Sequence, residues 1–564
     1  MSRLGQEHFD VLVIGGGLTG AGVALDAVSR GYSVALVDKG DFASGTSSKS
    51  TKLVHGGIRY LPNFDFGLVH EALVERGLLL QIAPYLVHPI EFVLPMYEGD
   101  RHPVGMPFTT PRGIGLEQIL NLGLTLYDLM AGKRSIKRHR HLTREEVLKF
   151  APALVTEGLN DGFTYYDAQT NDARLTMALI LTAAQYGATI TNYTQLTSFV
   201  KDSNGKVNGA VIHDNIDNRD FTVNARYIIN AAGVYAANVE AMTGVEPQIS
   251  IEPSKGVHLV FSREDLQIGD RAIVLPETED RRILFLVPWE SRVVFGTTDT
   301  GSGDLEHPVT TYEEIQYLLK YLNRYLTLNL TQDNIISTYA GYRPLVKPRN
   351  TKASTAKLSR SHVVLESESG LISIVGGKMT TYRRMAEDTV DVLSRRDQSR
   401  PTHATQSMPL QGSAGWSRIR HNINDRGLKL GLTQPAIQHL GSSYGTNAQK
   451  ILDLVEQDST LGELLISDLP YIKAEVLYAV RNEMAMTVKD VLERRTSIIL
   501  EDRQRGLGVA NEVAGILARE LNWSESRKQA MIDEYQQEID LEHNAELGQT
   551  DHLPASAPVQ KVLN

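Results

Sequence analysis

The sequence of 564 residues contains no cysteine. Without cysteine the chain forms no disulfide and cannot bind zinc or an iron–sulfur cluster through thiolates, and we expect no metal centre. The sequence also lacks any apolar stretch of the roughly 20 residues that a membrane-spanning helix needs. The first ten residues, MSRLGQEHFD, have no apolar core, so we expect no signal peptide. These absences favour a cytoplasmic protein that contacts a membrane only from its surface.

Basic residues are also fewer than acidic residues. The chain has 57 basic and 67 acidic residues, which gives a net charge of −10. Proteins that bind nucleic acid usually carry a basic surface, so we expect no nucleic-acid partner. The composition, 42% hydrophobic and 22% charged, is that of a globular protein, and the length predicts about two to four domains.

The first forty residues contain a strand, a glycine-rich turn, a helix and a second strand. FDVLVI (9–14) is rich in β-branched residues and predicts a buried strand. The turn that follows has the spacing Gly15-x-Gly17-x-x-Gly20, and the second strand, YSVALVD, ends at Asp38. A glycine triplet in this context is typical of a dinucleotide-binding unit.

Each residue of this unit has a physical task. Gly15 allows the tight turn, Gly17 lets the backbone approach a pyrophosphate, and Gly20 lets the helix pack close to the strand. The N-terminus of the helix offers free N–H groups to the pyrophosphate. The carboxylate of Asp38 can accept hydrogen bonds from the adenosine ribose. Both FAD and NAD enzymes use such a unit.

The next segment favours FAD. It contains a series of small hydroxyl residues, at Thr46, Ser47, Ser48, Ser50 and Thr51. Such a loop can follow a long, extended cofactor and donate hydrogen bonds to its phosphates and ribityl chain. A nicotinamide enzyme usually needs no second strip of this kind.

Seven stretches of the chain resemble one family. They are GTSSKSTKLVHGGIRYL (45–61), YYDAQTNDARL (165–175), NAAGVYA (230–236), PSKGVHLVF (253–261), VPWESRVVFGTTDT (287–300), YAGYRPL (339–345) and VGGKMTTYRRMAE (375–387). In this order they closely resemble the FAD-dependent sn-glycerol-3-phosphate dehydrogenases of the respiratory, aerobic type. The resemblance covers nearly all of residues 8–395, and it departs at Asp38, where the family often has glutamate.

The resemblance and the residue pattern together imply an α/β fold. We expect a Rossmann-like FAD-binding domain of the glutathione-reductase/D-amino-acid-oxidase type, a substrate domain on an antiparallel sheet, and an all-helical C-terminal domain. The segment RRILFLVPWESRVVFGTTD predicts a hairpin about Glu290 and Ser291. The expected ranges are 1–80, 160–245 and 360–395 for the first domain, 81–159 and 246–359 for the second, 412–545 for the third, and 546–564 for a disordered tail.

The family's reaction oxidises sn-glycerol 3-phosphate at C2. The substrate phosphate needs cations, and we expect Arg59 and Arg343 to supply them. Removal of the hydroxyl proton needs a base, for which His55 and His258 are both candidates. The sequence does not choose between these two histidines. We also expect Lys378 beside the developing alkoxide, and Tyr60 and Thr298 in contact with substrate.

Small residues near two later strand ends complete the predicted cofactor site. ARYIINAAG runs into Ala231 and Gly233, where a strand end would crowd the cofactor. A second unit, strand, Gly-Gly and helix, would bring a helix N-terminus near Thr380 to the flavin and help to stabilise its reduced form together with Lys378. The remaining expected cofactor contacts are Gly56, Gly57, Gly377 and Met379.

The resemblance also implies an electron acceptor in the membrane, either ubiquinone or menaquinone. We therefore expect a protein on the inner face of the cytoplasmic membrane. Residues 112–141 are the candidate docking segment, because an apolar stretch precedes a cluster of basic residues. The alternatives are an oxidase of the same substrate that makes peroxide, an amine or amino-acid oxidase, and a flavin-binding module without activity. A homodimer is left open.

Overall fold

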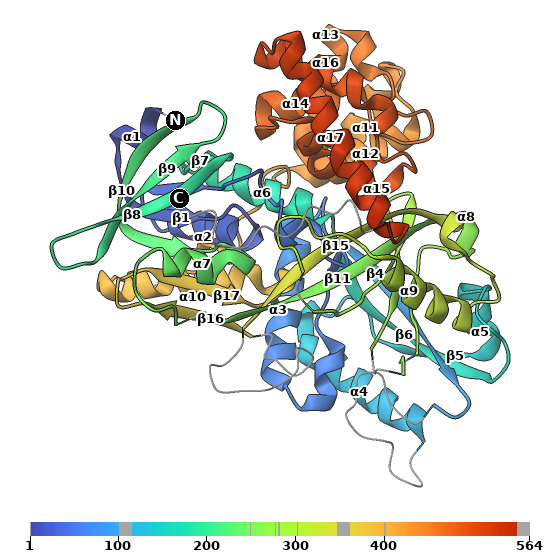
Figure 1. The fold of residues 1–564 in the computed structure, drawn as a ribbon. Helices are drawn as coiled ribbons and strands as arrows, with labels where there is room; N and C mark the ends of the chain where they lie inside the picture. Colours follow the sequence, from blue (N-terminus) through green and yellow to red (C-terminus); the bar gives the residue numbers. More distant parts are fainter. Residues whose placement is uncertain are drawn as a thin grey trace.

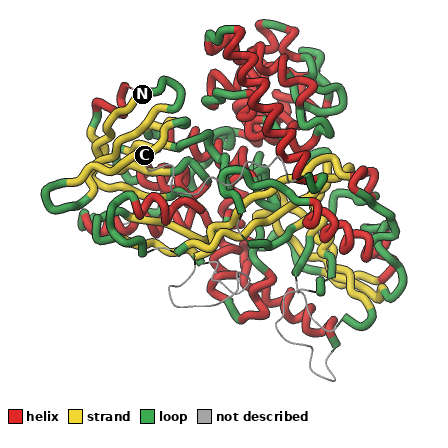
Figure 2. Tube along the Cα trace, in the orientation of Figure 1, coloured by secondary structure: helices red, strands yellow, loops and turns green. Residues whose placement is uncertain are grey.

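The chain folds into two β-sheets with flanking helices and a separate group of helices at the C-terminal end (Figure 1, Figure 2). The side chains of Ser2, Arg59, Pro62 and Asn63 are not described. The predicted tail falls outside the described residues from position 550 onward. The computed structural model describes residues 2–100, 115–248, 250–276, 278–279, 282–301, 303–346, 361–399 and 402–549.

The first sheet has eight strands and a parallel centre. Pairs β1–β10, β1–β2, β10–β17 and β2–β7 are parallel, as the predicted strand–helix–strand unit requires. The order along the sheet is β16 (His362–Glu366), β17 (Ile372–Gly376), β10 (Arg219–Asn230), β1 (His8–Ile14), β2 (Val34–Val37) and β7 (Thr189–Thr191), with β8 (Thr194–Lys201) and β9 (Val207–Asp214) added antiparallel at β10.

Three helices cover this sheet, and close glycine packing brings two of them together. They are α2 (Leu18–Ser29), α6 (Asp172–Gln185) and α10 (Tyr382–Arg396). A Cβ at Gly22 of α2 would lie 2.9 Å from the ring of Tyr382, so the glycine allows α2 and α10 to pack closely. The strands of this core are almost entirely buried, which explains their continuous apolar sequences.

The second sheet has nine strands and is mainly antiparallel. The predicted hairpin is confirmed, because β13 and β14 pair antiparallel about Glu290 and Ser291. Only β12 and β4 run parallel among the described pairs. The order is β15 (Ile335–Val346), β11 (Ile251–Ser262), β14 (Arg292–Gly296), β13 (Phe285–Trp289), β12 (Ala272–Val274), β4 (His88–Tyr97), β6 (Leu159–Gln169) and β3 (Leu53–Val54), with β5 (Arg140–Thr143) on β6.

Strand β6 begins at Leu159 and belongs to this second sheet. The boundary expected at residue 160 therefore falls inside a strand that pairs with β4 and β3, because the chain returns to the first sheet only after β6. The remaining helices in the described part of the first 400 residues are α1 (Ser2–Gln6), α3 (Phe66–Ile82), α4 (Leu116–Ala131), α5 (Arg144–Phe150), α7 (Ala236–Ala241), α8 (Arg263–Leu266) and α9 (Tyr312–Tyr325).

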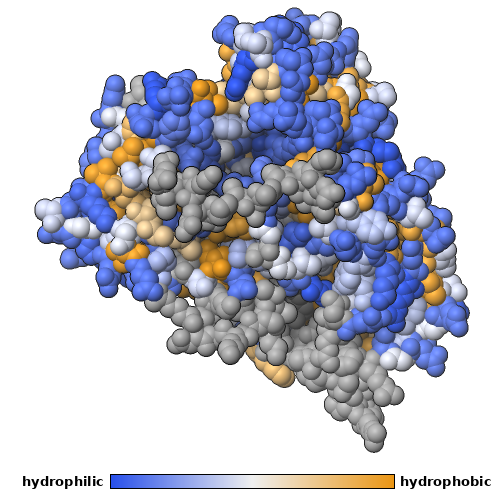
Figure 3. All heavy atoms as spheres, viewed as in Figure 1, coloured by the Kyte–Doolittle hydropathy of each residue, from blue (hydrophilic) through white to orange (hydrophobic). Residues whose placement is uncertain are grey.

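The C-terminal helices gather at the top of Figure 1 around one core of their own and a second core that they share with the second sheet. The outer face of this group is mainly hydrophilic in the view of Figure 3. Among the described helices, none is both long and apolar enough to cross a membrane. The C-terminal elements are α11 (Trp416–Lys429), α12 (Gln434–Tyr444), α13 (Ala448–Gln457), α14 (Lys473–Glu483), α15 (Ile498–Glu501), α16 (Ala510–Leu521) and α17 (Glu525–Glu546).

Candidate active site

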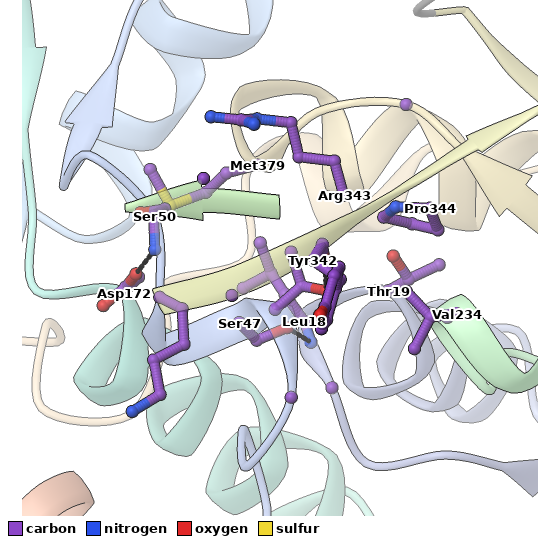
Figure 4. Close-up of a pocket in the computed structure, with 18 of the residues that line it drawn as sticks. Leu18, Thr19, Ser47, Ser50, Asp172, Val234, Tyr342, Arg343, Pro344 and Met379 are labelled. Atoms are coloured by element: carbon purple, nitrogen blue, oxygen red, sulfur yellow. Dashed lines mark hydrogen bonds between the residues drawn. The ribbon is translucent and has the colours of Figure 1, made fainter. Parts of the chain in front are cut away.

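A cavity of about 1670 Å³ lies between the two sheets. One wall is formed by the glycine turn after β1 and by the hydroxyl-rich loop, and the opposite wall by β11, β15 and the segment after β17. Figure 4 shows side chains from these separate segments side by side, including Leu18, Ser47, Arg343 and Met379. Residues of the predicted cofactor site and of the predicted substrate site thus line the same cavity.

The glycine turn has the geometry that its sequence predicts. Gly15 adopts a φ of +108°, and a Cβ there would lie 2.6 Å from the carbonyl oxygen of Ala231. A Cβ at Gly20 would lie 1.9 Å from the carbonyl oxygen of Gly15, so Gly20 packs the helix against the turn and does not line the cavity. Gly17 faces the cavity, where a Cβ would approach only the Ser47 hydroxyl, at 3.1 Å.

The hydroxyl-rich loop is joined to both walls of the cavity. The backbone N–H of Leu18, at the start of α2, donates to Ser47 Oγ at 2.9 Å (Figure 4). Thr46 Oγ1 donates to the carbonyl of Tyr342 at 2.5 Å. Ser48 is buried and does not line the cavity, and its carbonyl accepts from Lys52 Nζ at 2.6 Å. Thr46 and Ser47 thus face the cavity, whereas Ser48 supports the loop from behind.

Asp38 lies at the end of β2, on the cavity wall. Its carboxylate accepts hydrogen bonds from the backbone N–H groups of Gly16 at 2.6 Å and Gly40 at 2.9 Å. Burial raises the pKa of Asp38 to about 6, although these two N–H groups favour the charged form. Each carboxylate oxygen keeps a lone pair with which to accept from a ribose hydroxyl.

These observations fit an FAD. The N-terminus of α2 opens into the cavity behind a glycine that leaves room for a pyrophosphate. Ala231 and Gly233 line the same wall, and the backbone of Gly233 takes a φ of +58° that favours glycine. Lys378, Met379 and Thr380 line the far end together with Gly377. The residues that would hold the cofactor are therefore those of the glycine turn, the loop and this last segment.

The stretch HGGIRY forms a hinge beside that far end. Gly57 has a φ of +77° and lines the cavity. Gly56 faces the other way: its N–H donates to Asp167 Oδ1 at 2.9 Å, and a Cβ would lie 2.3 Å from the Tyr127 hydroxyl. The backbone of His55 exchanges two hydrogen bonds of 3.1 Å with the Thr380 hydroxyl. The hinge is thus fixed to the segment after β17.

This link brings Tyr60 and Lys378 together. Lys378 Nζ lies 4.0 Å from the centre of the Tyr60 ring, which is a cation–π contact. Both residues line the cavity, and Lys378 precedes the short helical turn Met379–Thr381 that leads into α10. Helical structure therefore begins next to Thr380, as predicted. The side chain of Arg59 lies outside the described residues.

His258 lies on β11 and is buried. Its Nε2 shares a hydrogen bond of 2.9 Å with Thr51 Oγ1, and its ring stacks on Tyr339 with centroids 4.6 Å apart. Nδ1 has no hydrogen-bond partner in the part of the chain that the structure describes. Burial, followed by the charges of Arg343 and Lys52, lowers the pKa of His258 well below its usual value. The imidazole is therefore neutral near pH 7.

Arg343 lies opposite Ser254 in the register of β15 and β11. Its Nη2 donates to Thr297 Oγ1 at 3.0 Å, and its Nη1 donates to the carbonyl of Thr298 at 3.3 Å. The hydroxyl of Thr298 accepts from the N–H of Val257 at 3.0 Å. Thr298, expected to contact substrate, thus holds β11 through its hydroxyl and Arg343 through its carbonyl.

Four buried charged residues near the site had no assigned role in the sequence analysis. Lys52 Nζ and Asp172 Oδ1 are 2.5 Å apart and buried, and Asp172 also accepts from the Ser50 N–H at 2.9 Å (Figure 4). Asp167 accepts from Arg76 at 2.7 Å behind the hinge. For Arg76 the available signal was a charged residue within the apolar stretch of α3, but its partner Asp167 is distant in sequence.

Comparisons with known proteins agree with this geometry. The family model described as FAD dependent oxidoreductase (DAO) matches residues 10–383, and the model described as the C-terminal domain of alpha-glycerophosphate oxidase matches residues 403–528. A solved structure of an L-alpha-glycerophosphate oxidase from Mycoplasma pneumoniae with FAD bound shares the fold, at 18% identity over 69% of this chain and 95% of that chain, with a TM-score of 0.52.

Relatives with higher identity span nearly the whole chain. The mitochondrial glycerol-3-phosphate dehydrogenase of Mus musculus is 38% identical over 94% of this chain and 73% of its own length. Glycerol-3-phosphate dehydrogenase 2 of Mycobacterium tuberculosis is 36% identical over 99% and 93%. The structure of the Bacillus halodurans glycerol-3-phosphate dehydrogenase complexed with FAD covers 98% of both chains at 29% identity, with a TM-score of 0.78. The chain thus belongs to the FAD-dependent glycerol-3-phosphate dehydrogenase family of oxidoreductases.

Proposed function

We propose that this enzyme oxidises sn-glycerol 3-phosphate at C2 to dihydroxyacetone phosphate and passes the electrons to a membrane quinone. The names of the relatives, which are glycerol-3-phosphate dehydrogenases, support this substrate. The observation that carries the proposal is a neutral, buried histidine, His258, on the strand beside Arg343 in one cavity. A base and a fixed cation side by side suit a phosphorylated secondary alcohol.

His258 would take the C2 hydroxyl proton. Its Nδ1 is the nitrogen without a partner among the described residues, while Thr51 holds Nε2. When bound, FAD would accept the hydride that leaves C2 as the carbonyl forms. We prefer His258 to His55 as the base because a neutral nitrogen of His258 is left to accept a proton. His55 also lines the cavity.

The cations would bind the phosphate and orient the substrate. Hydrogen bonds to Thr297 and Thr298 fix the orientation of the Arg343 guanidinium. In this orientation the guanidinium would donate to phosphate oxygens of the substrate. Lys378 lies over the ring of Tyr60 and would stabilise negative charge on the C2 oxygen. Arg59 stays a predicted phosphate ligand, because it follows the hinge at Gly57 in the sequence.

Helix α4 supports peripheral docking on the inner face of the cytoplasmic membrane. Leu120, Leu124 and Tyr127 on one side of the helix are buried, but Leu122 and Leu129 are 71% and 70% exposed. Phe64 and Phe66, near the start of α3, are exposed as well. Exposed basic residues follow α4 at Lys133, Arg134, Lys137, Arg138 and Arg140. An apolar surface beside a basic cluster suits anionic lipid.

A membrane surface is where a dehydrogenase would meet a quinone. An oxidase that uses O2 is not favoured, because the relatives that cover most of this chain are named dehydrogenases. The choice of ubiquinone or menaquinone and the homodimer stay predictions.

Anaerobic reduction tests the proposed reaction. We expect glycerol 3-phosphate to bleach the ~450 nm flavin band of the purified enzyme. Alanine and sarcosine should leave this band unchanged. The reduced enzyme should then be reoxidised faster by a soluble quinone than by O2, without stoichiometric peroxide. Bleaching by an amine, or peroxide formed at the rate of substrate oxidation, would contradict the proposal.

A further inference from the structure

The hydroxyl-rich loop has two faces, and the second face meets the C-terminal helices. Residues 38–52 form what we call the cofactor loop. On one face, Thr46, Ser47 and Lys49 line the cavity. On the other face, the side chain of Asp41 is completely buried and does not line the cavity.

Asp41 is bound by two arginines of the C-terminal domain. Arg494 Nε donates to Asp41 Oδ2 at 2.6 Å, and Arg495 donates through both terminal nitrogens, to Oδ2 and Oδ1, at 2.7 Å each. Asn192 Nδ2 also donates to Asp41 Oδ1, at 3.0 Å. Burial favours the neutral acid, but the two guanidiniums outweigh it and lower the pKa of Asp41 to about 2.

A second ion pair reaches the cavity wall itself. Lys49 Nζ lies 2.5 Å from Glu493 Oε1, and Lys49 lines the cavity. The side chain of Lys49 also packs on Gly341 of β15, where a Cβ would lie 2.4 Å from Lys49 Cβ. Glu493 is in turn bound by Arg494. The two ion pairs therefore join the C-terminal domain to both ends of the same loop.

All three C-terminal partners come from one short segment. Glu493, Arg494 and Arg495 are consecutive in the π-helical turn Asp490–Arg495. This turn is held within its own domain, because Arg494 donates to Asp490 at 2.7 Å and Arg495 donates to the carbonyl of Glu483 at 2.8 Å. A π-helical turn often marks a functional position, and here it presents adjacent charges to one loop.

We propose that the C-terminal domain is part of the FAD site: Glu493, Arg494 and Arg495 are positioning residues that hold the cofactor loop in its binding conformation through Lys49 and Asp41. The Asp41 pair lies outside the cavity lining, and the Lys49 pair meets the cavity wall at Gly341 of β15. Loss of the pairs would release the loop, and FAD would then pay the entropy of ordering it on binding. This inference concerns FAD alone and is independent of the substrate and of the electron acceptor.

The test compares two variants that each remove one buried guanidinium from the same domain interface. Arg494→Met removes a contact to the cofactor loop. Arg174→Met removes the buried pair of Arg174 with Glu483, whose two bonds of 2.7 Å join α6 to α14; Arg174 itself binds neither Asp41 nor Lys49, and the carbonyl of Glu483 keeps its bond to Arg495. The dissociation constant of FAD is measured for each holoenzyme by flavin fluorescence on dilution, at a temperature where circular dichroism shows both variants folded.

We expect Arg494→Met to raise the dissociation constant of FAD at least tenfold and Arg174→Met to raise it less than threefold. Equal dissociation constants would overturn the proposal. Glu493→Gln is a milder variant for the case that Arg494→Met does not fold, since Lys49 is partly exposed and Arg494 keeps its bonds to Asp41. It should speed hydrogen exchange of the amides of residues 42–52 in the holoenzyme, and unchanged exchange would contradict the inference.

Discussion

The guanidinium of Arg343 lies directly against the backbone of Gly256. A Cβ at position 256 would lie 2.4 Å from Arg343 Nη2 and 2.8 Å from its Cζ. The two residues sit on neighbouring strands, β15 and β11, where Gly256 pairs with Gly341. The absence of a side chain at Gly256 thus leaves the space that the guanidinium occupies beside Thr297 and Thr298.

Gly256→Ala should therefore weaken substrate binding without loss of the cofactor. The methyl group would displace the flexible end of Arg343, so we expect KM for glycerol 3-phosphate to rise about tenfold, which corresponds to about 1.4 kcal/mol. FAD content should be unchanged. Arg343→Ala sets the upper limit of the effect. Gly269→Ala is the control, because a Cβ there meets no atom within 4 Å. A KM equal to that of the control would remove this contact from the substrate site.

Gly17→Val should fold but bind no FAD. In the structure a Cβ at Gly17 meets only the Ser47 hydroxyl, at 3.1 Å, so a small shift of the Ser47 side chain makes room for it. The isopropyl group would instead occupy the space of the pyrophosphate. The variant should purify colourless with a circular dichroism spectrum like that of the wild type. Gly123→Ala, on α4, should retain its flavin. A yellow Gly17→Val protein would show that the glycine turn is not the pyrophosphate site.

Thr51→Val should lower kcat and leave KM and flavin content close to wild type. Thr51 Oγ1 shares the hydrogen bond that orients His258 Nε2, and valine has the same shape without a hydroxyl. Loss of this partner frees the ring to take the wrong tautomer, and we expect kcat to fall about 10- to 100-fold. Thr51→Ser should restore most of the activity. Equal kcat values for all three proteins would exclude a positioning role.

The lowered pKa of His258 predicts a pH-dependent stability. Below about pH 6.5 the unfolded chain protonates this histidine, but the folded chain does not, so the free energy of unfolding decreases as the pH falls. The contribution is at most about 1.4 kcal/mol per pH unit, because one proton is involved. Urea unfolding of wild type and His258→Asn between pH 8 and pH 5.5 measures it. Parallel pH dependences in the two proteins would contradict a neutral buried His258.

The basic cluster after α4 should decide membrane binding. Glutamate at Lys133, Arg134, Lys137 and Arg138 should reduce sedimentation with anionic liposomes at least tenfold, since each basic side chain near such a surface contributes about 1 kcal/mol. A matched control places glutamate at four exposed basic residues of the C-terminal domain: Arg418, Arg420, Lys429 and Lys450. Equal loss in both variants would indicate an effect of net charge rather than of this surface.

The dinucleotide unit was predictable from the sequence because all its determinants are local. The strand, the three glycines and the helix lie within one stretch, and Gly20 is required by its contact with Gly15, although Gly15 itself packs against the distant Ala231. The hairpin about Glu290 was predictable for the same reason, since period-two alternation and a turn are short-range signals. The family resemblance then extended this local reading to nearly the whole chain.

Only the tertiary structure decided which distant residues meet. His258 faces Thr51 and stacks on Tyr339, and Lys378 covers Tyr60, through pairings between elements that no periodicity connects. The attachment of Asp41 to Arg495 joins the loop after β2 to a turn near the other end of the chain. From the sequence alone, a charged residue that will be buried indicates only that it needs a partner. Which partner it finds depends on the packing of the whole chain, because side chains far apart in sequence meet only when the elements that carry them pack together.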